Sequence, residues 1–291
     1  MLVMAATFCR HFVQKLSIAR HVKSFAASVS EISGNRDDQE RKVNVNGVDI
    51  NYLKVGTGDH AVLLLPGVAG SIWSHFKPQI EGFDREKFTI VAWEPVGYGK
   101  SRPPDRTFPD DFLQRDAIDA RDLMKVLGFT KFSVVGWSDG GITVLFLAAM
   151  FPENVRKMVC FAGNAYITPT EIEIYKKSRD FDSWSEKRRA SMITVYGEEY
   201  SRKLWADWVD ACDRIYEKQN GNLCKELLPK IRCPTFLLHG AKDRMVLAEH
   251  PLYLKQHIHG AKLKIMEEGR HSIHLQYPKE FNDLVTEFLL E

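Results

Sequence analysis

The chain has 291 residues, of which 44% are hydrophobic and 27% are charged, and it contains 19 glycines and 12 prolines. This composition is typical of a folded globular protein and excludes a disordered, collagen-like or very small disulfide-held chain. With 40 basic and 38 acidic residues the formal net charge is only +2, so no charge excess points to nucleic acid or an anionic membrane as the main partner.

The first 30 residues differ in composition from the rest. They contain four serines and the basic residues Arg10, Lys15, Arg20 and Lys23, and no acidic residue precedes Glu31. An amphipathic, basic and acid-poor segment is typical of a mitochondrial transit peptide, and the polar residues 31–41 would form a linker. We therefore expect residues 1–41 to be a transit peptide and linker. If the segment is only a basic tail, the expected location is cytoplasmic rather than mitochondrial.

The next segment predicts a sheet. Residues 43–52 alternate apolar and polar side chains around Asn46-Gly47, which is the strongest short-range signal for a β-hairpin. Continuous apolar runs, which suit central parallel strands, follow at residues 61–65, 88–93, 132–137 and 158–162. Stretches with helical spacing, such as residues 110–127, separate these runs. This alternation predicts an α/β fold with a mostly parallel sheet and helices on both faces.

The alternation stops after the fourth run. Residues 165–229 have the spacing of helices and are rich in Trp and Tyr, so we interpret them as a helical cap inserted into a core of residues 42–164 and 230–291. The sheet resumes with runs at 235–238 and 263–266, and the last helix is expected at 278–290. Aromatic side chains of the cap can line an apolar pocket, but the sequence does not tell which of them face it.

The motif Gly136-Trp137-Ser138-Asp139-Gly140 matches G-x-S-x-G and lies between a predicted buried strand and a predicted helix. A sharp turn there would lift the serine above the sheet, and the glycines would let the neighbouring backbone approach. The N-terminus of the following helix favours negative charge at the same place. Ser138 is therefore the candidate nucleophile.

A serine hydroxyl needs a neutral histidine as base, oriented by a carboxylate. Asp243 follows the run at 235–238, and His271 follows the run at 263–266, so the chain order Ser, Asp, His fits this architecture. Alone, Asp243 could be an ordinary turn aspartate and His271 a surface or packing residue. Because all three follow strands that end at one edge of a parallel sheet, we predict that they form a catalytic triad.

An ester-cleaving site also needs donors for the oxyanion. The backbone N–H groups of Asp139, next to the candidate nucleophile, and of Val68, in the turn after residue 65, are the candidates. For Val68 an ordinary strand-ending turn explains the sequence equally well.

No metal or cofactor is expected. The pairs His257-x-His259 and His271-x-x-His274 lack the cysteine or carboxylate that would complete a zinc site. No run of about 18 apolar residues predicts a membrane span. The odd number of cysteines without a C-x-x-C motif predicts reduced, buried thiols at Cys9, Cys160, Cys212, Cys224 and Cys233.

Together these features resemble the α/β-hydrolase fold over residues 42–291. Within that superfamily the chain is similar to the valacyclovir hydrolase, or biphenyl hydrolase-like, family. Three stretches carry this resemblance: Gly136-Trp137-Ser138-Asp139-Gly140-Gly141, Arg102-Pro103-Pro104-Asp105-Arg106 and Gly163-Asn164-Ala165-Tyr166. One stretch departs from the common pattern, since Glu94-Pro95-Val96-Gly97 replaces Asp-x-Arg-Gly and leaves this loop without its usual arginine.

The resemblance implies a serine hydrolase that cleaves small α-amino acid esters through an acyl-enzyme. It places the nucleophile at Ser138, the acid at Asp243, the base at His271 and the carboxylate that binds the substrate amine at Asp139. Without the resemblance, Asp139 could equally be a helix-terminal residue that stabilises the dipole. The expected partner is a small-molecule ester, and a monomer without bound nucleic acid is expected.

Two alternatives remain. The first is a carbon–carbon bond hydrolase of ring-cleavage products, although Asp139 would repel the carboxylates of such substrates. The second is a non-catalytic ligand receptor on the same fold, against which the apparently complete triad argues. Dehalogenase and epoxide hydrolase chemistry would need an aspartate in place of Ser138.

Overall fold

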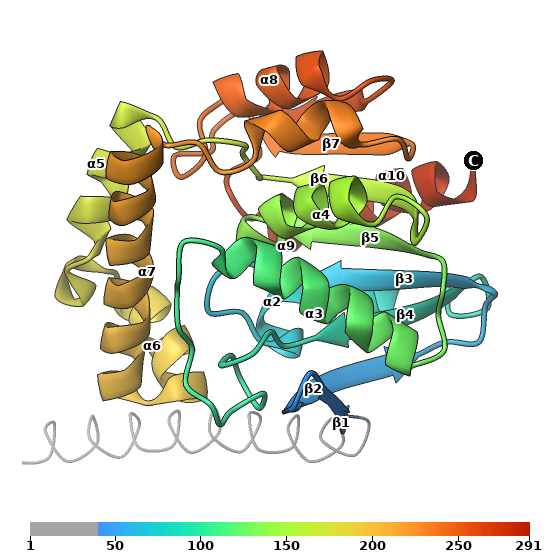
Figure 1. Ribbon diagram of the computed structural model, residues 1–291, viewed down its shortest axis with the longest axis horizontal. Helices are drawn as coiled ribbons and strands as arrows, with labels where there is room; N and C mark the ends of the chain where they lie inside the picture. The colour runs from blue at the N-terminus through green and yellow to red at the C-terminus, as the bar shows by residue number, and fades with distance from the viewer. Residues whose placement is uncertain (1–39) are drawn as a thin grey trace, which may run out of the picture. The chain divides into compact units, whose positions relative to one another are not determined.

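A computed structural model describes residues 40–291 (Figure 1). The predicted transit segment lies almost entirely outside the described residues, so the targeting hypothesis stays a prediction. Within residues 40–291, the helices are too short or too polar to span a lipid bilayer.

The described chain opens with the predicted hairpin. Strands β1 (Glu40–Val45) and β2 (Val48–Val55) are joined by Asn46 and Gly47, whose φ angles are 51° and 87°. Two consecutive positive φ values are what a type I′ hairpin turn requires, and Asn-Gly adopts them at low cost. Strand β2 then pairs antiparallel with β4, so the hairpin forms one edge of the sheet.

The sheet has eight strands in the order β1-β2-β4-β3-β5-β6-β7-β8. From β4 to β8 each neighbouring pair is parallel. The prediction of a mostly parallel sheet is therefore confirmed. The six parallel strands are β3 (His60–Leu65), β4 (Phe88–Trp93), β5 (Phe132–Trp137), β6 (Val155–Phe161), β7 (Thr235–Gly240) and β8 (Lys262–Met266).

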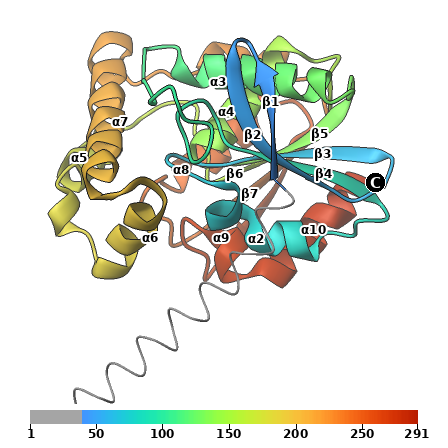
Figure 2. The ribbon, with the colours of Figure 1, turned by 90° about the horizontal axis from the view of Figure 1, so that it is seen from below.

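Helices cover both faces of the sheet (Figure 2). Along β3, Leu63 and Leu65 pack into the core on the side of α3 and α4, whereas Val62 and Leu64 pack into the core on the side of α2 and α10. This alternation follows from the two-residue period of a strand, and it explains why β3 is apolar throughout. The core helices are α2 (Ile72–Gly82), α3 (Phe112–Val126), α4 (Asp139–Met150), α8 (Glu249–His257), α9 (Ile273–Gln276) and α10 (Pro278–Leu290).

Three helices and two short 3-10 turns occupy the segment that the sequence assigns to a cap. They lie between β6 and β7 in the chain. The three helices stand beside the carboxyl ends of the parallel strands, whereas the second 3-10 turn packs against α4 and α8 (Figure 1). The elements are α5 (Pro169–Ser178), η2 (Phe181–Ser183), α6 (Glu186–Tyr196), α7 (Glu198–Gln219) and η3 (Lys225–Lys230).

The loop that lacks the family's usual arginine is anchored by Arg106 instead. Its guanidinium is buried and pairs with both carboxylate oxygens of Asp116 at 2.6 and 2.7 Å, and it donates to the carbonyl oxygen of Val96 at 3.1 Å. It also lies 4.6 Å from the centre of the Tyr98 ring. An arginine later in the chain therefore fixes the loop of residues 94–106 against α3.

Arg106→Ala is expected to lower the free energy of unfolding by about 3–5 kcal/mol, because it leaves the carboxylate of Asp116 buried without its cation. Urea denaturation measures this loss. Lys279→Ala is the matched control, since its ion pair with Asp283 is exposed and its removal should change stability by less than about 0.5 kcal/mol. Equal stability of the two variants would contradict the anchoring role.

Candidate active site

Ser138 lies in the sharp turn between β5 and α4. Its φ and ψ angles are 56° and −120°, a region that non-glycine residues rarely occupy, and its backbone N–H donates to the Phe161 carbonyl at 3.1 Å. A Cβ built on Gly136 would lie 2.2 Å from the carbonyl oxygen of Gly140, and one built on Gly140 would lie 2.2 Å from that of Leu65. The two glycines therefore allow the close contact between strand and helix that the turn needs.

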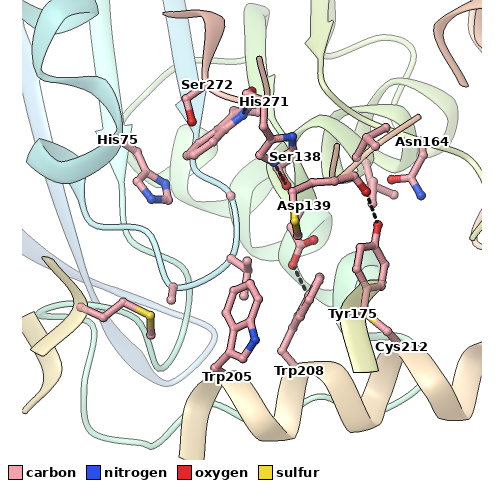
Figure 3. Close-up of a pocket in the computed structure, with 18 of the residues that line it drawn as sticks. His75, Ser138, Asp139, Asn164, Tyr175, Trp205, Trp208, Cys212, His271 and Ser272 are labelled. Carbon is pink, nitrogen blue, oxygen red and sulfur yellow. Dashed lines mark hydrogen bonds between the residues drawn. The ribbon is translucent and has the colours of Figure 1, made fainter. Parts of the chain in front are cut away.

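Three loops bring the predicted triad together. Nε2 of His271 lies 3.1 Å from Oγ of Ser138, and Nδ1 of His271 lies 2.8 Å from Oδ2 of Asp243 (Figure 3). Asp243 follows β7 and His271 follows β8, so each side chain projects from the carboxyl end of its strand. The other carboxylate oxygen of Asp243 accepts the backbone N–H groups of Met245 and Val246 at 2.8 and 3.1 Å.

The hydrogen bonds around Asp243 keep it ionised. Burial raises the pKa of this carboxyl. The hydrogen bond and charge of His271, together with the two backbone N–H donors, lower the pKa by more than burial raises it, so the net shift is downward. An ionised Asp243 accepts a hydrogen bond from the N–H group at Nδ1 of His271, which leaves Nε2 unprotonated and able to accept the proton of Ser138. The arrangement can therefore activate a serine hydroxyl for attack on a carbonyl.

A cavity of about 510 Å³ opens beside Ser138 and His271. Its walls are largely aromatic and aliphatic, as in most sites for small molecules. The structure settles which cap aromatics contribute: Tyr175, Trp184, Trp205 and Trp208 line the cavity. Two further tyrosines of the cap, Tyr196 and Tyr200, bind the core instead. Tyr196 accepts the backbone N–H of Gly99, and Tyr200 accepts that of Arg106.

Asp139 places a buried carboxylate in this cavity. Its side chain is on the first turn of α4 and accepts the indole N–H of Trp208 at 2.9 Å (Figure 3). Burial raises the pKa of Asp139 to about 7, although the charge of Arg106 and the hydrogen bond from Trp208 act in the opposite direction. A carboxylate that is costly to ionise alone is well suited to bind a cation within the same cavity.

The two candidate oxyanion donors border Ser138. Asp139 is the first residue of α4, so its backbone N–H has no partner inside the helix. Val68 lines the cavity, and a Cβ built on the preceding Gly67 would lie 3.1 Å from Cβ of Ser138. The turn that contains Val68 therefore runs directly beside the candidate nucleophile.

Helix α5 of the cap holds the loop that follows Asp243. The carboxylate of Glu171 accepts the backbone N–H of Leu247 at 2.9 Å and lies 2.8 Å from Nε2 of His250, and both side chains are fully buried. The hydroxyl of Tyr175 donates to the carbonyl of Met245 at 3.1 Å. Sequence reasoning missed this network. Thr168 and Glu171 have the spacing of a capping box, which marks a helix start but not a contact with a residue 79 positions away.

His257 and His274, from the two histidine pairs noted in the sequence, have packing roles, and His259 is exposed. Nε2 of His274 lies 2.8 Å from the carbonyl oxygen of His75, and the ring of His257 stacks on Tyr253. Burial lowers the pKa of His75 to about 3, so it stays neutral.

Across residues 40–291, no group of three or more His, Cys, Asp or Glu could hold a metal ion. The four cysteines of this part of the chain are buried free thiols, and Cys9 lies outside it.

Comparison with known proteins agrees with the geometry. Residues 60–207 match the sequence model of the α/β hydrolase fold. The proteins named serine hydrolase BPHL from Mus musculus and Homo sapiens are 50% and 47% identical, in each case over 85% of both chains. A 2-hydroxy-6-oxo-6-phenylhexa-2,4-dienoate hydrolase from Comamonas testosteroni is 26% identical over 82% of this chain and 91% of its own.

Solved structures share the fold at lower identity. An enol-lactonase from Burkholderia xenovorans LB400 superimposes with a TM-score of 0.69 and 20% identity, over 86% of this chain and all of its own. A metagenomic α/β hydrolase, MGS-M2, reaches a TM-score of 0.73 at 18% identity, over 86% of this chain and 98% of its own. The chain therefore belongs to the α/β-hydrolase family and is one of its serine hydrolases.

Proposed function

We propose that the protein hydrolyses small esters of α-amino acids through an acyl-enzyme on Ser138. The observation that carries the proposal is the buried carboxylate of Asp139, which shares a cavity with Ser138 and His271. The resemblance to the valacyclovir hydrolase family, noted from the sequence, supports the same substrate class.

The geometry suits two-step acyl transfer. Oγ of Ser138 attacks the ester carbonyl while His271 accepts the hydroxyl proton, and the resulting oxyanion is stabilised by the backbone N–H groups of Asp139 and Val68. The tetrahedral intermediate collapses, and His271 returns the proton to the departing alcohol. A water molecule then loses a proton to His271 and attacks the acyl group, which regenerates Ser138.

Asp139 would orient the substrate. The ammonium group of an α-amino ester is attached to the carbon next to the reacting carbonyl, so a carboxylate beside the nucleophile can bind it while the carbonyl faces Ser138. Inside the cavity this ion pair is less screened by water than a surface pair. The indole N–H of Trp208 occupies one carboxylate oxygen, which fixes the side chain and leaves the other oxygen for the ammonium group.

A carbon–carbon bond hydrolase is the second candidate, because distant relatives carry names such as 2-hydroxy-6-oxo-6-phenylhexa-2,4-dienoate hydrolase. We expect kcat/KM for valine p-nitrophenyl ester to exceed that for this dienoate by at least about 100-fold, since ionised Asp139 would repel the dienoate carboxylate. Initial rates with both substrates decide between the two enzymes. Faster cleavage of the dienoate would replace our proposal.

A further inference from the structure

Arg188 places a positive charge on the wall of the same cavity. It lies in the first turn of α6, and its guanidinium stacks 3.5 Å from the centre of the Trp184 ring and 4.9 Å from that of Trp205. Both indoles are buried, and their N–H groups donate to the carbonyl and the hydroxyl of Ser178. The guanidinium therefore rests on a fixed aromatic platform.

This charge has no anionic partner among residues 40–291. Its neighbour Arg189 pairs with Asp182, and Arg202 pairs with Asp182 and Glu198, whereas no ion pair or side-chain hydrogen bond joins Arg188 to a described carboxylate. Desolvation against the indoles lowers the pKa of Arg188 to about 10, which keeps the guanidinium cationic at neutral pH. Its charge is thus available to a ligand.

Arg188 is exposed at the cavity wall, and two indoles link it to Asp139: it lies 4.9 Å from the Trp205 ring, and Trp205 packs 4.8 Å from Trp208, which donates to Asp139. Five residues that line the cavity are solvent-exposed, and three of them come from α6: Ser74, Arg188, Ser191, Val195 and Leu275. Asp139 is only 8% exposed. If the proposed function holds, the acyl part with its ammonium group lies at the buried end, and the leaving group extends past Ser138 to the exposed wall.

We propose that Arg188 binds an anionic group, a carboxylate or a phosphate, on the leaving group of the substrate. The cavity would then have two poles, a carboxylate for the acyl amine and a guanidinium for the leaving group. The preferred substrates are aminoacyl esters of alcohols that carry an oxyanion. The direction of binding rests on the proposed function, whereas the anion site itself rests on Arg188 and its platform.

Three valine esters of matched shape test this site. Their alcohols are 4-(hydroxymethyl)benzoate, 4-(hydroxymethyl)phenyl phosphate and neutral 4-(hydroxymethyl)benzamide. We expect the wild type to prefer one or both anionic esters over the amide by about fivefold to tenfold in kcat/KM, mainly through KM, and the preference to shrink at high salt. The anionic ester with the larger kcat/KM relative to the amide shows whether the site prefers a carboxylate or a phosphate. Arg188→Gln should lose the preference, and Arg189→Gln, on the same helix but outside the cavity, should retain it.

Equal kcat/KM for all three esters in the wild type would overturn the anion site, as would a preference that survives in Arg188→Gln or disappears equally in Arg189→Gln. If the proposed function is wrong, a different result is expected: none of the three valine esters is hydrolysed. The isovaleryl esters of the same three alcohols then test Arg188 alone, because they lack the amine. Absence of turnover in both series would overturn both proposals.

Discussion

Ser138→Ala is expected to lower kcat for valine p-nitrophenyl ester by about four to six orders of magnitude, because Ser138 is the hydroxyl that His271 contacts and can activate to receive the acyl group. The same variant should lose all labelling by a fluorophosphonate probe, which reacts with an activated serine. Steady-state kinetics and gel fluorescence measure the two effects. Ser183→Ala, at an exposed position of the cap, is the control and should match the wild type.

The outcome also tests the receptor alternative. If the protein were a non-catalytic binding protein whose serine is not activated, the wild type would remain unlabelled and would show no Ser138-dependent turnover of any ester. The 3.1 Å contact between His271 and Ser138 predicts the opposite. Full labelling of Ser138→Ala would mean that the reactive serine lies elsewhere in the chain.

Asp139→Asn is expected to have the second largest effect. At pH 7.5 it should lower the ratio of kcat/KM for valine p-nitrophenyl ester to that for isovaleryl p-nitrophenyl ester by about 100-fold, which corresponds to about 2.7 kcal/mol. The amide keeps the shape of the side chain but loses the charge that binds the ammonium group. Asp210→Asn removes an equal charge from the exposed surface of the cap and should leave the ratio unchanged.

The same ratio should depend on pH in a way that identifies Asp139. Because burial raises the pKa of Asp139 to about 7, the carboxylate is protonated progressively below that pH, and the ratio should fall about tenfold per unit. Above about pH 8 the substrate amine loses its own proton and the ratio should fall again. Protonation of His271 lowers kcat/KM for both esters equally, so it does not change their ratio. If the ratio of Asp139→Asn still falls below about pH 7, the titrating group is not Asp139.

The strands and the elbow could be predicted because their signals are local. A central strand of a parallel sheet is apolar on both faces, so runs such as those of β3 and β5 are visible in the sequence alone. The Asn46-Gly47 turn and the G-x-S-x-G motif specify their backbone by the few residue types that tolerate it. Chain order then selected Asp243 and His271, since loops after parallel strands meet at one edge.

The surroundings of the site could not be predicted, because they depend on side chains that meet only after folding. Trp208 reaches Asp139 from a helix 69 positions later in the chain, and Glu171 reaches His250 across 79 positions. Neither pair carries a local pattern. Arg106 likewise gave no sign that it replaces the missing loop arginine, since an arginine is normally exposed and its burial against Asp116 depends on the packing of α3.

The most direct test of the account is the ratio of kcat/KM for valine p-nitrophenyl ester to isovaleryl p-nitrophenyl ester with the wild-type protein at pH 7.5. The two esters differ only in the α-amino group, so the ratio measures what that group contributes to the transition state. We predict a ratio of about 100 or more. A ratio near one, with Ser138-dependent turnover of both esters, would leave a serine hydrolase but would contradict the recognition of α-amino acid esters by Asp139.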